Sequence, residues 1–211
     1  NLAIANDWMH KNPFAGIRFQ EKEVIREVLT KEEIERMMCK EFALPRLEYV
    51  RDVFIFCVFT GMAYVDVNNL RQEHIVRDNN DDLWIRKARQ KTNNMCNIPL
   101  LKIPQLLMEK YKNHPLCTKT GALLPVPSNQ KMNSYLKEIA DFCGIQKNLT
   151  THTARHTFAT VVALANGVSM ENIAKMLGHS DIRMTQRYAK VMDSSIMRDM
   201  ENVDKLFKSS E

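Results

Sequence analysis

The sequence predicts a mainly α-helical domain with a small three-stranded antiparallel β-sheet. Apolar residues recur at helical spacing over most of the chain, and three short runs typical of strands lie close together between residues 75 and 100. Turn residues separate these three runs. With 211 residues, of which 45% are hydrophobic and 26% charged, the chain is long enough to bury one main core.

The N-terminal part of the chain is predicted to contain a domain boundary. A helix from Leu2 to about His10 ends before Asn12-Pro13, because proline disfavours continuation of a helix. The expected units are the end of a preceding domain, a charged linker, the main domain and a C-terminal helix, at residues 1–12, 13–28, 29–193 and 194–211.

Helix and strand signals follow one another through the main domain. Thr30 and Glu33 form a capping box that starts a helix ending near Cys39. A strongly apolar helix and a short third helix are expected next, at residues 47–59 and 65–70. The three strands are expected at residues 75–76, 83–85 and 97–100. Further helices are expected at residues 104–112, 130–142, 153–165, 170–177, 182–191 and 194–207.

A first motif, His152-Thr-Ala-Arg155-His156, carries side chains suited to binding a phosphate. Thr150 and Thr151 can cap a helix that begins near His152. Three-residue spacing then places His152 and Arg155 on one helix face, where both can donate to the same phosphate.

A second motif, Leu177-Gly178-His179, is followed nine residues after its histidine by Tyr188. Glycine commonly ends a helix, so His179 is expected at a helix end, and Ser180 or Asp181 can cap the next helix. That next helix carries Tyr188.

These side chains suit attack on a phosphodiester. A tyrosine hydroxyl can form a covalent phosphotyrosine that stores the energy of the broken bond, so cleavage and rejoining need no ATP. A guanidinium and imidazole donors can stabilise the charged transition state without a metal or another cofactor. Lys91, in the turn Arg89–Asn94, can give a proton to the departing 5′ oxygen.

Taken together, the motifs resemble the tyrosine recombinase (phage integrase) family over about residues 29–207. The resemblance includes the opening Leu29-Thr-Lys-Glu-Glu33, the turn Thr60-Gly61 and the terminal Arg187-Tyr188. It implies an integrase-like catalytic core, preceded by a core-DNA-binding domain and followed by a helix that either packs on its own domain or docks on a neighbouring protomer. The catalytic residues that it implies are Tyr188 as nucleophile, Arg155 as phosphate clamp, His152 and His179 as donors or proton carriers, and Lys91 as general acid.

One position departs from the pattern of that family. Most members have a second catalytic arginine three residues after the threonine of Thr60-Gly61, whereas this chain has Ala63. A small residue there resembles the integrases of conjugative and mobilisable elements. We hypothesise that another guanidinium supplies the missing charge, with Arg51 as the first candidate and Arg71 as the second. The alternative is that Arg155 alone holds the phosphate.

The charge distribution favours a nucleic-acid partner. The net charge is only +5, but the segment from Trp84 to Leu101 holds four basic residues and no acid. Such clusters suit contacts with DNA phosphates. The residues assigned to DNA contacts are Arg51, Arg71, Arg89, Arg187 and His156.

The remaining features suit a protein that acts on DNA inside the cell. The five cysteines show no paired spacing and are interpreted as reduced and mostly buried. The longest nearly apolar run, Val53 to Val65, is too short to cross a bilayer, so no membrane partner is expected and a cytoplasmic location is inferred. The expected partners are a double-stranded DNA attachment site, other protomers in a synaptic tetramer and, as an option, accessory DNA-bending proteins.

Plainer interpretations exist for individual residues. His152 and His156 have metal-ligand spacing, but the glutamate of a zinc protease helix is missing and Arg155 would repel a cation, so no metal site is assigned. His156 can support its helix, His179 can be a helix-end residue, and Lys91 can be a solvated turn lysine. Tyr188 without the two motifs would be interpreted as a packing residue.

Two other functions fit parts of the sequence. Residues 168–188 also resemble a helix-turn-helix, which would make the protein a DNA-binding regulator without full catalytic power. A type IB-like topoisomerase would use the same nucleophile and phosphate clamp as a monomer. The main prediction remains a site-specific recombinase or integrase of a mobile genetic element.

Overall fold

The computed structural model describes residues 2–14, 16 and 27–188. Most of the expected linker and the expected helix at residues 194–207 lie outside the described residues. The helices before the sheet are α1 (Leu2–Ala5), α2 (Lys31–Cys39), α3 (Pro45–Thr60), α4 (Tyr64–Asn68) and the 3-10 helix η1 (Gln72–His74). The strands are β1 (Ile75–Arg77), β2 (Leu83–Ala88) and β3 (Met95–Pro99). The elements after the sheet are α5 (Lys102–Tyr111), α6 (Pro115–Thr120), α7 (Asn129–Phe142), α8 (Thr151–Thr157), η2 (Phe158–Ala163), η3 (Leu164–Asn166), α9 (Met170–Leu177) and α10 (Arg183–Gln186).

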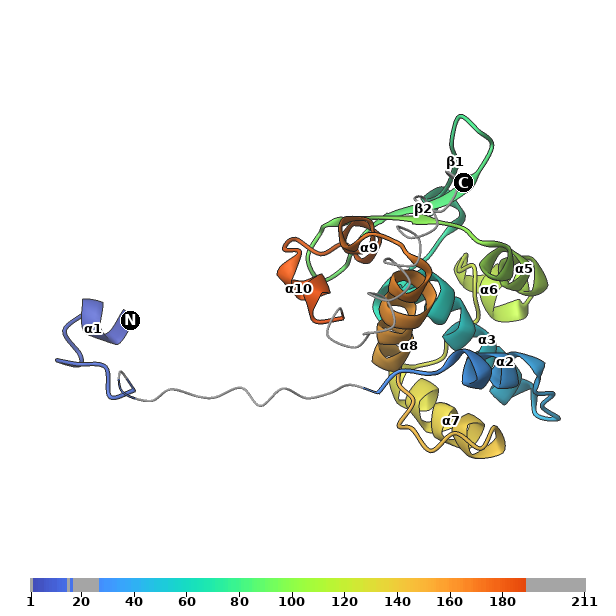
Figure 1. Cartoon of the computed structure of the whole chain (residues 1–211), viewed down its shortest axis with the longest axis horizontal. Coiled ribbons are helices and arrows are strands. Elements are labelled where there is room, and N and C mark those ends of the chain that lie inside the picture. The colour runs from blue at the N-terminus through green and yellow to red at the C-terminus, as the bar shows by residue number, and fades with distance from the viewer. Residues whose placement is uncertain (1, 15, 17–26, 189–211) are drawn as a thin grey trace, which may run out of the picture.

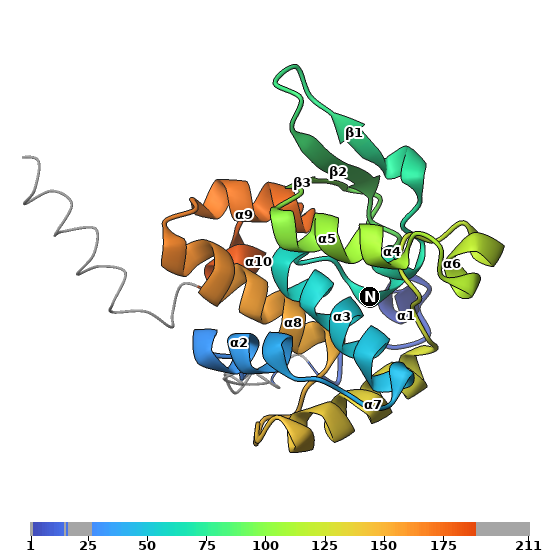
Figure 2. The same ribbon diagram turned by 90° about the vertical axis from the view of Figure 1, so that its right-hand side faces the viewer.

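Helix α3 runs through the centre of the helical body (Figures 1 and 2). It packs against α2, α5, α7 and α8, so its apolar residues are buried on every side instead of forming one stripe. Pro45 begins the helix at a position where no intrahelical N–H is needed, and Gly61 ends it with φ +66°. A Cβ on Gly61 would lie 2.4 Å from the Phe158 ring, so only glycine fits between α3 and η2.

The sheet is antiparallel with strand order β1-β2-β3. Ile85 pairs with Ile75 on one side and Ile98 on the other, and both Ile85 and Ile98 are buried. The sheet lies at one end of the helical body and α7 lies at the opposite end (Figures 1 and 2). Because α9 packs against β3, the second motif lies beside the β2–β3 turn.

Most predicted elements of the main domain are confirmed. The capping box is present, with Glu33 N–H donating to Thr30 Oγ1 and Thr30 N–H donating to Glu33. The mainly helical fold with a three-stranded antiparallel sheet is also as expected. The described cysteines are free thiols, and four of the five are buried. No described helix has the length and apolar character needed to cross a membrane.

Several elements differ from the sequence prediction. The helix expected from Leu2 to about His10 is reduced to α1, which ends at Ala5. The helix expected at 153–165 begins as α8, widens into the π-helix η2 and ends as the 3-10 helix η3. Helix α6 was not predicted, because its six residues are too few to show an apolar period. Helix α10 is shorter than expected within the described residues, and Asp181 Oδ1 accepts a hydrogen bond of 2.8 Å from Arg183 N–H at its start, as the sequence predicts.

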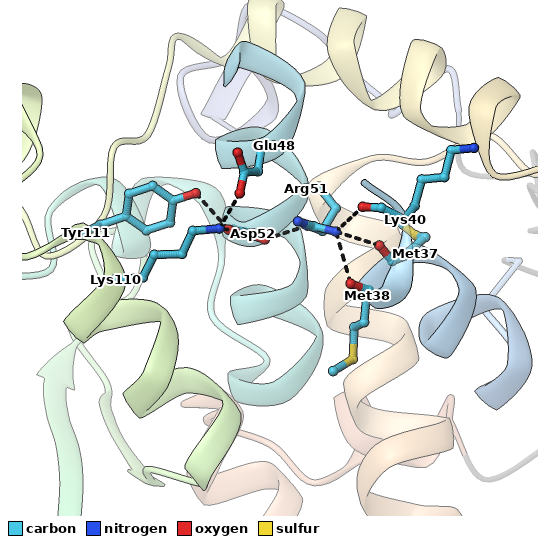
Figure 3. A network of polar contacts seen from close by, with 8 residues as sticks. All are labelled: Met37, Met38, Lys40, Glu48, Arg51, Asp52, Lys110 and Tyr111. Atoms are coloured by element: carbon cyan, nitrogen blue, oxygen red, sulfur yellow. Dashed lines mark hydrogen bonds and ion pairs between the residues drawn. The ribbon is translucent and has the colours of Figure 1, made fainter. Parts of the chain in front are cut away.

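A buried ionic network joins α2, α3 and α5 (Figure 3). Asp52 is 3% exposed and accepts hydrogen bonds from Arg51 Nε, Lys110 Nζ and Tyr111 Oη. Arg51 Nη1 donates to the carbonyls of Met37, Met38 and Lys40 at the end of α2. The network thus satisfies C-terminal carbonyls of α2 and fixes that helix to α3.

We expect Asp52→Ala to destabilise the protein by about 3 kcal/mol, because it leaves the buried Arg51 charge without its counter-charge. Glu48→Ala is the matched control, since Glu48 also contacts Lys110 but is much more exposed than Asp52. It should cost about 1 kcal/mol or less. Chemical denaturation of both variants measures the two changes. Equal losses would contradict the role assigned to Asp52.

Candidate functional site

Arg155 is the point where three of the sequence motifs meet. Its side chain leaves α8, is 7% exposed, and donates from Nη1 to Gly61 O at 2.6 Å and from Nη2 to Leu177 O at 2.6 Å. These carbonyls lie at the C-terminal ends of α3 and α9, where the helix dipoles favour a cation. Burial, followed by the nearby Arg89, lowers the pKa of Arg155. The guanidinium is therefore fixed in place before any ligand arrives.

His179 lies beside this guanidinium. Gly178 ends α9 in the left-handed conformation, and a Cβ there would lie 2.6 Å from Arg89 Cδ and 2.8 Å from Cys96 Sγ. The backbone can therefore approach the β2–β3 turn only because residue 178 is glycine. His179 Nε2 then lies 3.3 Å from Arg155 Nη2.

His179 is a neutral imidazole in this arrangement. Burial, then the charges of Arg155 and Arg89, lower its pKa from 6.5 to about 4. A guanidinium can only donate, so Nε2 accepts from Arg155 and the ring hydrogen is on Nδ1. Nδ1 then donates to Thr185 Oγ1, 2.8 Å away. His179 therefore has the form of a base, not of a charged donor.

Tyr188 is brought back against α8 by the turn that follows α9. Its side chain is 8% exposed and belongs to the small cluster around Phe158 and Leu177. The Tyr188 ring centroid lies 5.2 Å from that of His156 and 6.4 Å from that of His179, and the Tyr188 and His179 rings are nearly parallel. The phenol thus contacts one histidine from each motif, and Arg155 is near enough to interact with it electrostatically.

The turn that carries Lys91 is fixed at its base. Asp66, which is 4% exposed, accepts a hydrogen bond of 2.8 Å from Gln90 N–H. On the other side, Arg89 Nη1 and Asn94 Nδ2 lie 3.4 and 3.3 Å from Gly178 O. Lys91 is exposed at the tip. The turn is therefore anchored to α4 and to the second motif, while the lysine itself reaches solvent.

Arg51 and Arg71 were expected to replace the missing arginine, but the structure places both guanidinium groups on backbone carbonyls. Arg51 is buried in the network of Figure 3, and residue 51 lies nine helical residues, or about 13 Å, before Thr60. Arg71 Nη1 donates to the carbonyls of Asn68 and Leu70 at the end of α4. Both guanidinium groups satisfy helix-end carbonyls, so neither is assigned to DNA in this structure.

His152 and Arg155 point to different surroundings, although three residues separate them. His152 is exposed and lines an open groove of about 460 Å³ together with Glu27, Asn148, Thr150 and His156. Arg155 instead turns inward to Gly61 and Leu177. The two side chains are thus not side by side, and the shared phosphate contact stays a prediction. Arg187 is exposed next to Tyr188.

Three residues at this site were not singled out from the sequence, namely Asp66, Asn94 and Thr185. Asp66 follows the Thr60-Gly61 turn at short spacing, which was the available signal. The other two act through contacts to Gly178 and His179 that depend on the fold. Among the described residues, no group of three or more His, Cys, Asp or Glu side chains could hold a metal ion.

Solved structures with a similar fold include several DNA recombinases. A lambda integrase dimer bound to a core site aligns with a TM-score of 0.67 and 19% identity, over 89% of this chain and 67% of that chain. The Tn1549 transposon integrase in complex with a circular intermediate DNA aligns with a TM-score of 0.67 and 18% identity, over 95% and 74%. XerA recombinase aligns with a TM-score of 0.63 and 23% identity, over 87% and 66%. These likenesses show the fold.

Sequence comparison gives closer relatives over a shorter span. Tyrosine recombinase XerD of Staphylococcus saprophyticus is 40% identical over 95 residues, which are 45% of this chain and 31% of that protein. XerD of Staphylococcus aureus is 42% identical over 71 residues, or 34% and 24%. Each of these two alignments thus spans less than a third of the relative's own length. The model of the phage integrase family matches residues 27–195, and the protein therefore belongs to the phage integrase family.

Proposed function

We propose that this protein cuts and rejoins DNA at a specific site through a 3′-phosphotyrosine intermediate. The observation that carries the proposal is the convergence of Tyr188, Arg155 and His179, from separate motifs, on one buried cationic site. A phenol beside a fixed guanidinium and a neutral imidazole has the groups that a metal-independent phosphoryl transfer needs. The family and its relatives support the same reaction class.

In the proposed step, Tyr188 Oη forms a bond to phosphorus as the bond from phosphorus to the 5′ oxygen breaks. The phenol proton passes to a neutral imidazole, for which His179 and His156 are the adjacent candidates. Lys91 gives a proton to the departing 5′ oxygen. A 5′ hydroxyl of the same or another strand then reverses the step and releases the tyrosine.

The proposed partners are a double-stranded attachment site and other protomers in a synaptic tetramer. Solved relatives with this fold include DNA complexes of lambda integrase and of the Tn1549 transposon integrase. Lys91 and Arg187 are exposed near the site and are proposed to contact the DNA. His152 and His156 are proposed to contact it from the open groove on α8.

The helix-turn-helix alternative is weaker than this proposal. Its second helix would be α10, whose four described residues are short for a recognition helix in a DNA groove. A regulator that only binds DNA also has no need of a buried guanidinium beside a phenol. A topoisomerase shares the chemistry, so it is separated from the main proposal by experiment.

We expect Tyr188→Phe to form no covalent adduct with a nicked suicide substrate that carries the attachment site. Phenylalanine keeps the ring contacts with His156 and His179 but lacks the nucleophilic oxygen. Gel electrophoresis in SDS detects the adduct, and substitution of the exposed Tyr188 neighbour Gln186 by alanine is the control. Tight binding without any wild-type adduct would favour the regulator, and relaxation of supercoils without site preference would favour the topoisomerase.

We expect Arg155→Ala to slow adduct formation at least about 100-fold while weakening DNA binding less than about tenfold, because the clamp acts mainly on the transition state. Arg155 also donates to two backbone carbonyls, so the thermal unfolding of the Arg155→Ala variant is measured in parallel. Arg155→Lys, which keeps the charge, should be folded but still slow. Equal losses in binding and rate by this lysine variant would contradict the assigned role.

We expect His179 to titrate near pH 4 in the free protein, which NMR of its ring carbons can measure. Since the pKa in the unfolded chain is about 6.5, the unfolded state binds the proton first as the pH falls. The ring should therefore reduce stability as the pH drops from 6.5 to 4, and His179→Asn should remove that part of the pH dependence. A titration midpoint at or above 6.5 would show that the site does not hold a neutral ring.

A further inference from the structure

A second arginine, Arg89, is largely but not fully buried near Arg155, at the base of the β2–β3 turn. Its side chain is 11% exposed, and Nη1 lies 3.4 Å from Gly178 O. Its Nε is fully buried and donates no hydrogen bond to any described residue. Asp66 Oδ2 lies 4.0 Å from this nitrogen, which allows an ion pair but is too far for a hydrogen bond. A buried donor without an acceptor is unusual in a native protein and calls for a ligand or another explanation.

The charges around this nitrogen do not balance. Arg89 and Arg155 are close enough for each to oppose the charge of the other. Among the described residues, Asp66 is the one carboxylate within ion-pair distance of either guanidinium. His179 is neutral, and burial raises the pKa of Cys96, so its thiol adds no negative charge. The pocket therefore has one unmatched positive charge, which a phosphodiester would neutralise.

The position of Arg89 relative to Ala63 is equally informative. Ala63 is the N-cap of α4 and Asp66 is its third residue, so the two lie on neighbouring parts of that helix. Asp66 accepts from Gln90 N–H and pairs with Arg89. Arg89 follows β2 in the chain, and its side chain pairs with Asp66, three residues after Ala63. It therefore contacts the same short helix that Ala63 precedes.

We propose that Arg89 is the second phosphate-binding cation of the site and takes the place of an arginine at position 63. The inference rests on the proposed strand-transfer function. Arg89 and Arg155 would contact the non-bridging oxygens of the scissile phosphate from two sides, and the free Nε of Arg89 would gain an acceptor. Asp66 orients Arg89, and Gly178 leaves room for its side chain.

The test compares two substrates in single-turnover adduct formation. One carries an ordinary scissile phosphodiester, and the other carries a methylphosphonate, in which a methyl group removes the negative charge of one non-bridging oxygen. We expect Arg89→Ala to be at least about 100-fold slower than wild type on the phosphodiester. On the methylphosphonate the difference should shrink to about tenfold or less, because less charge needs stabilising.

Arg86→Ala is the matched control, since Arg86 lies on β2, three residues before Arg89, but is exposed. It should react within about threefold of wild type on both substrates. The double variant Ala63→Arg with Arg89→Ala should regain at least about tenfold in rate over Arg89→Ala on the phosphodiester. Thermal unfolding accompanies each measurement, and Arg89→Gln replaces Arg89→Ala if the alanine variant is unfolded.

Three outcomes would overturn the proposal. Arg89→Ala could react within about threefold of wild type on the phosphodiester, the defect could be equal on both substrates, or position 63 could fail to rescue. An equal defect on both substrates would indicate a purely structural role for Arg89. If wild-type protein forms no adduct with either substrate, the strand-transfer function itself fails, which is a distinguishable result.

Discussion

The structure of the site depends on one interaction, the pair of short hydrogen bonds from Arg155 to the carbonyls of Gly61 and Leu177. These bonds join the ends of α3 and α9, which are far apart in the sequence, through a side chain of α8. They also direct the guanidinium inward and set its distance to His179. Because both acceptors are helix-end carbonyls, the fold provides negative ends of two helix dipoles where a buried cation has to be held.

Burial has the largest effect on the pKa values of Arg155 and of its neighbours His179 and Cys96. A low-dielectric site strengthens each interaction of the guanidinium, including repulsion by Arg89. It also keeps His179 unprotonated and the Cys96 thiol neutral. The positive charges inside the site thus favour binding of an anion, whereas Lys91 and Arg187 are exposed to solvent. The buried arginines and the exposed basic residues therefore lie in different electrostatic environments.

Local signals in the sequence were sufficient for most of the fold. The capping box at Thr30, helix-ending Gly178 and the turn residues before β3 each determine their structure through neighbours in the chain. The widening of α8 into η2 was not visible from the sequence, and neither was the close approach of Phe158, the first residue of η2, to the distant Gly61. A short polar helix such as α6 has no periodic signal to detect.

The candidate site could be predicted in part. The motifs indicated Arg155, His179 and Tyr188, and the structure brings these residues together, although their roles stay predictions. The choice between Arg51, Arg71 and Arg89 was not available from the sequence, because the sequence does not show which backbone carbonyls or carboxylates each guanidinium contacts. Only the contacts of each guanidinium distinguish the three. Arg51 and Arg71 each donate to two or more helix-end carbonyls, whereas Arg89 has one long contact with Gly178 O and a buried Nε without an acceptor among the described residues.

Thr185 gives the site a mechanical link between two groups. Its hydroxyl accepts from His179 Nδ1, and its carbonyl accepts from Tyr188 N–H at 2.9 Å. A shift of the backbone at residue 188 is thereby transmitted to the imidazole through one fully buried side chain. The position of Tyr188 and the orientation of the His179 ring are therefore coupled through Thr185.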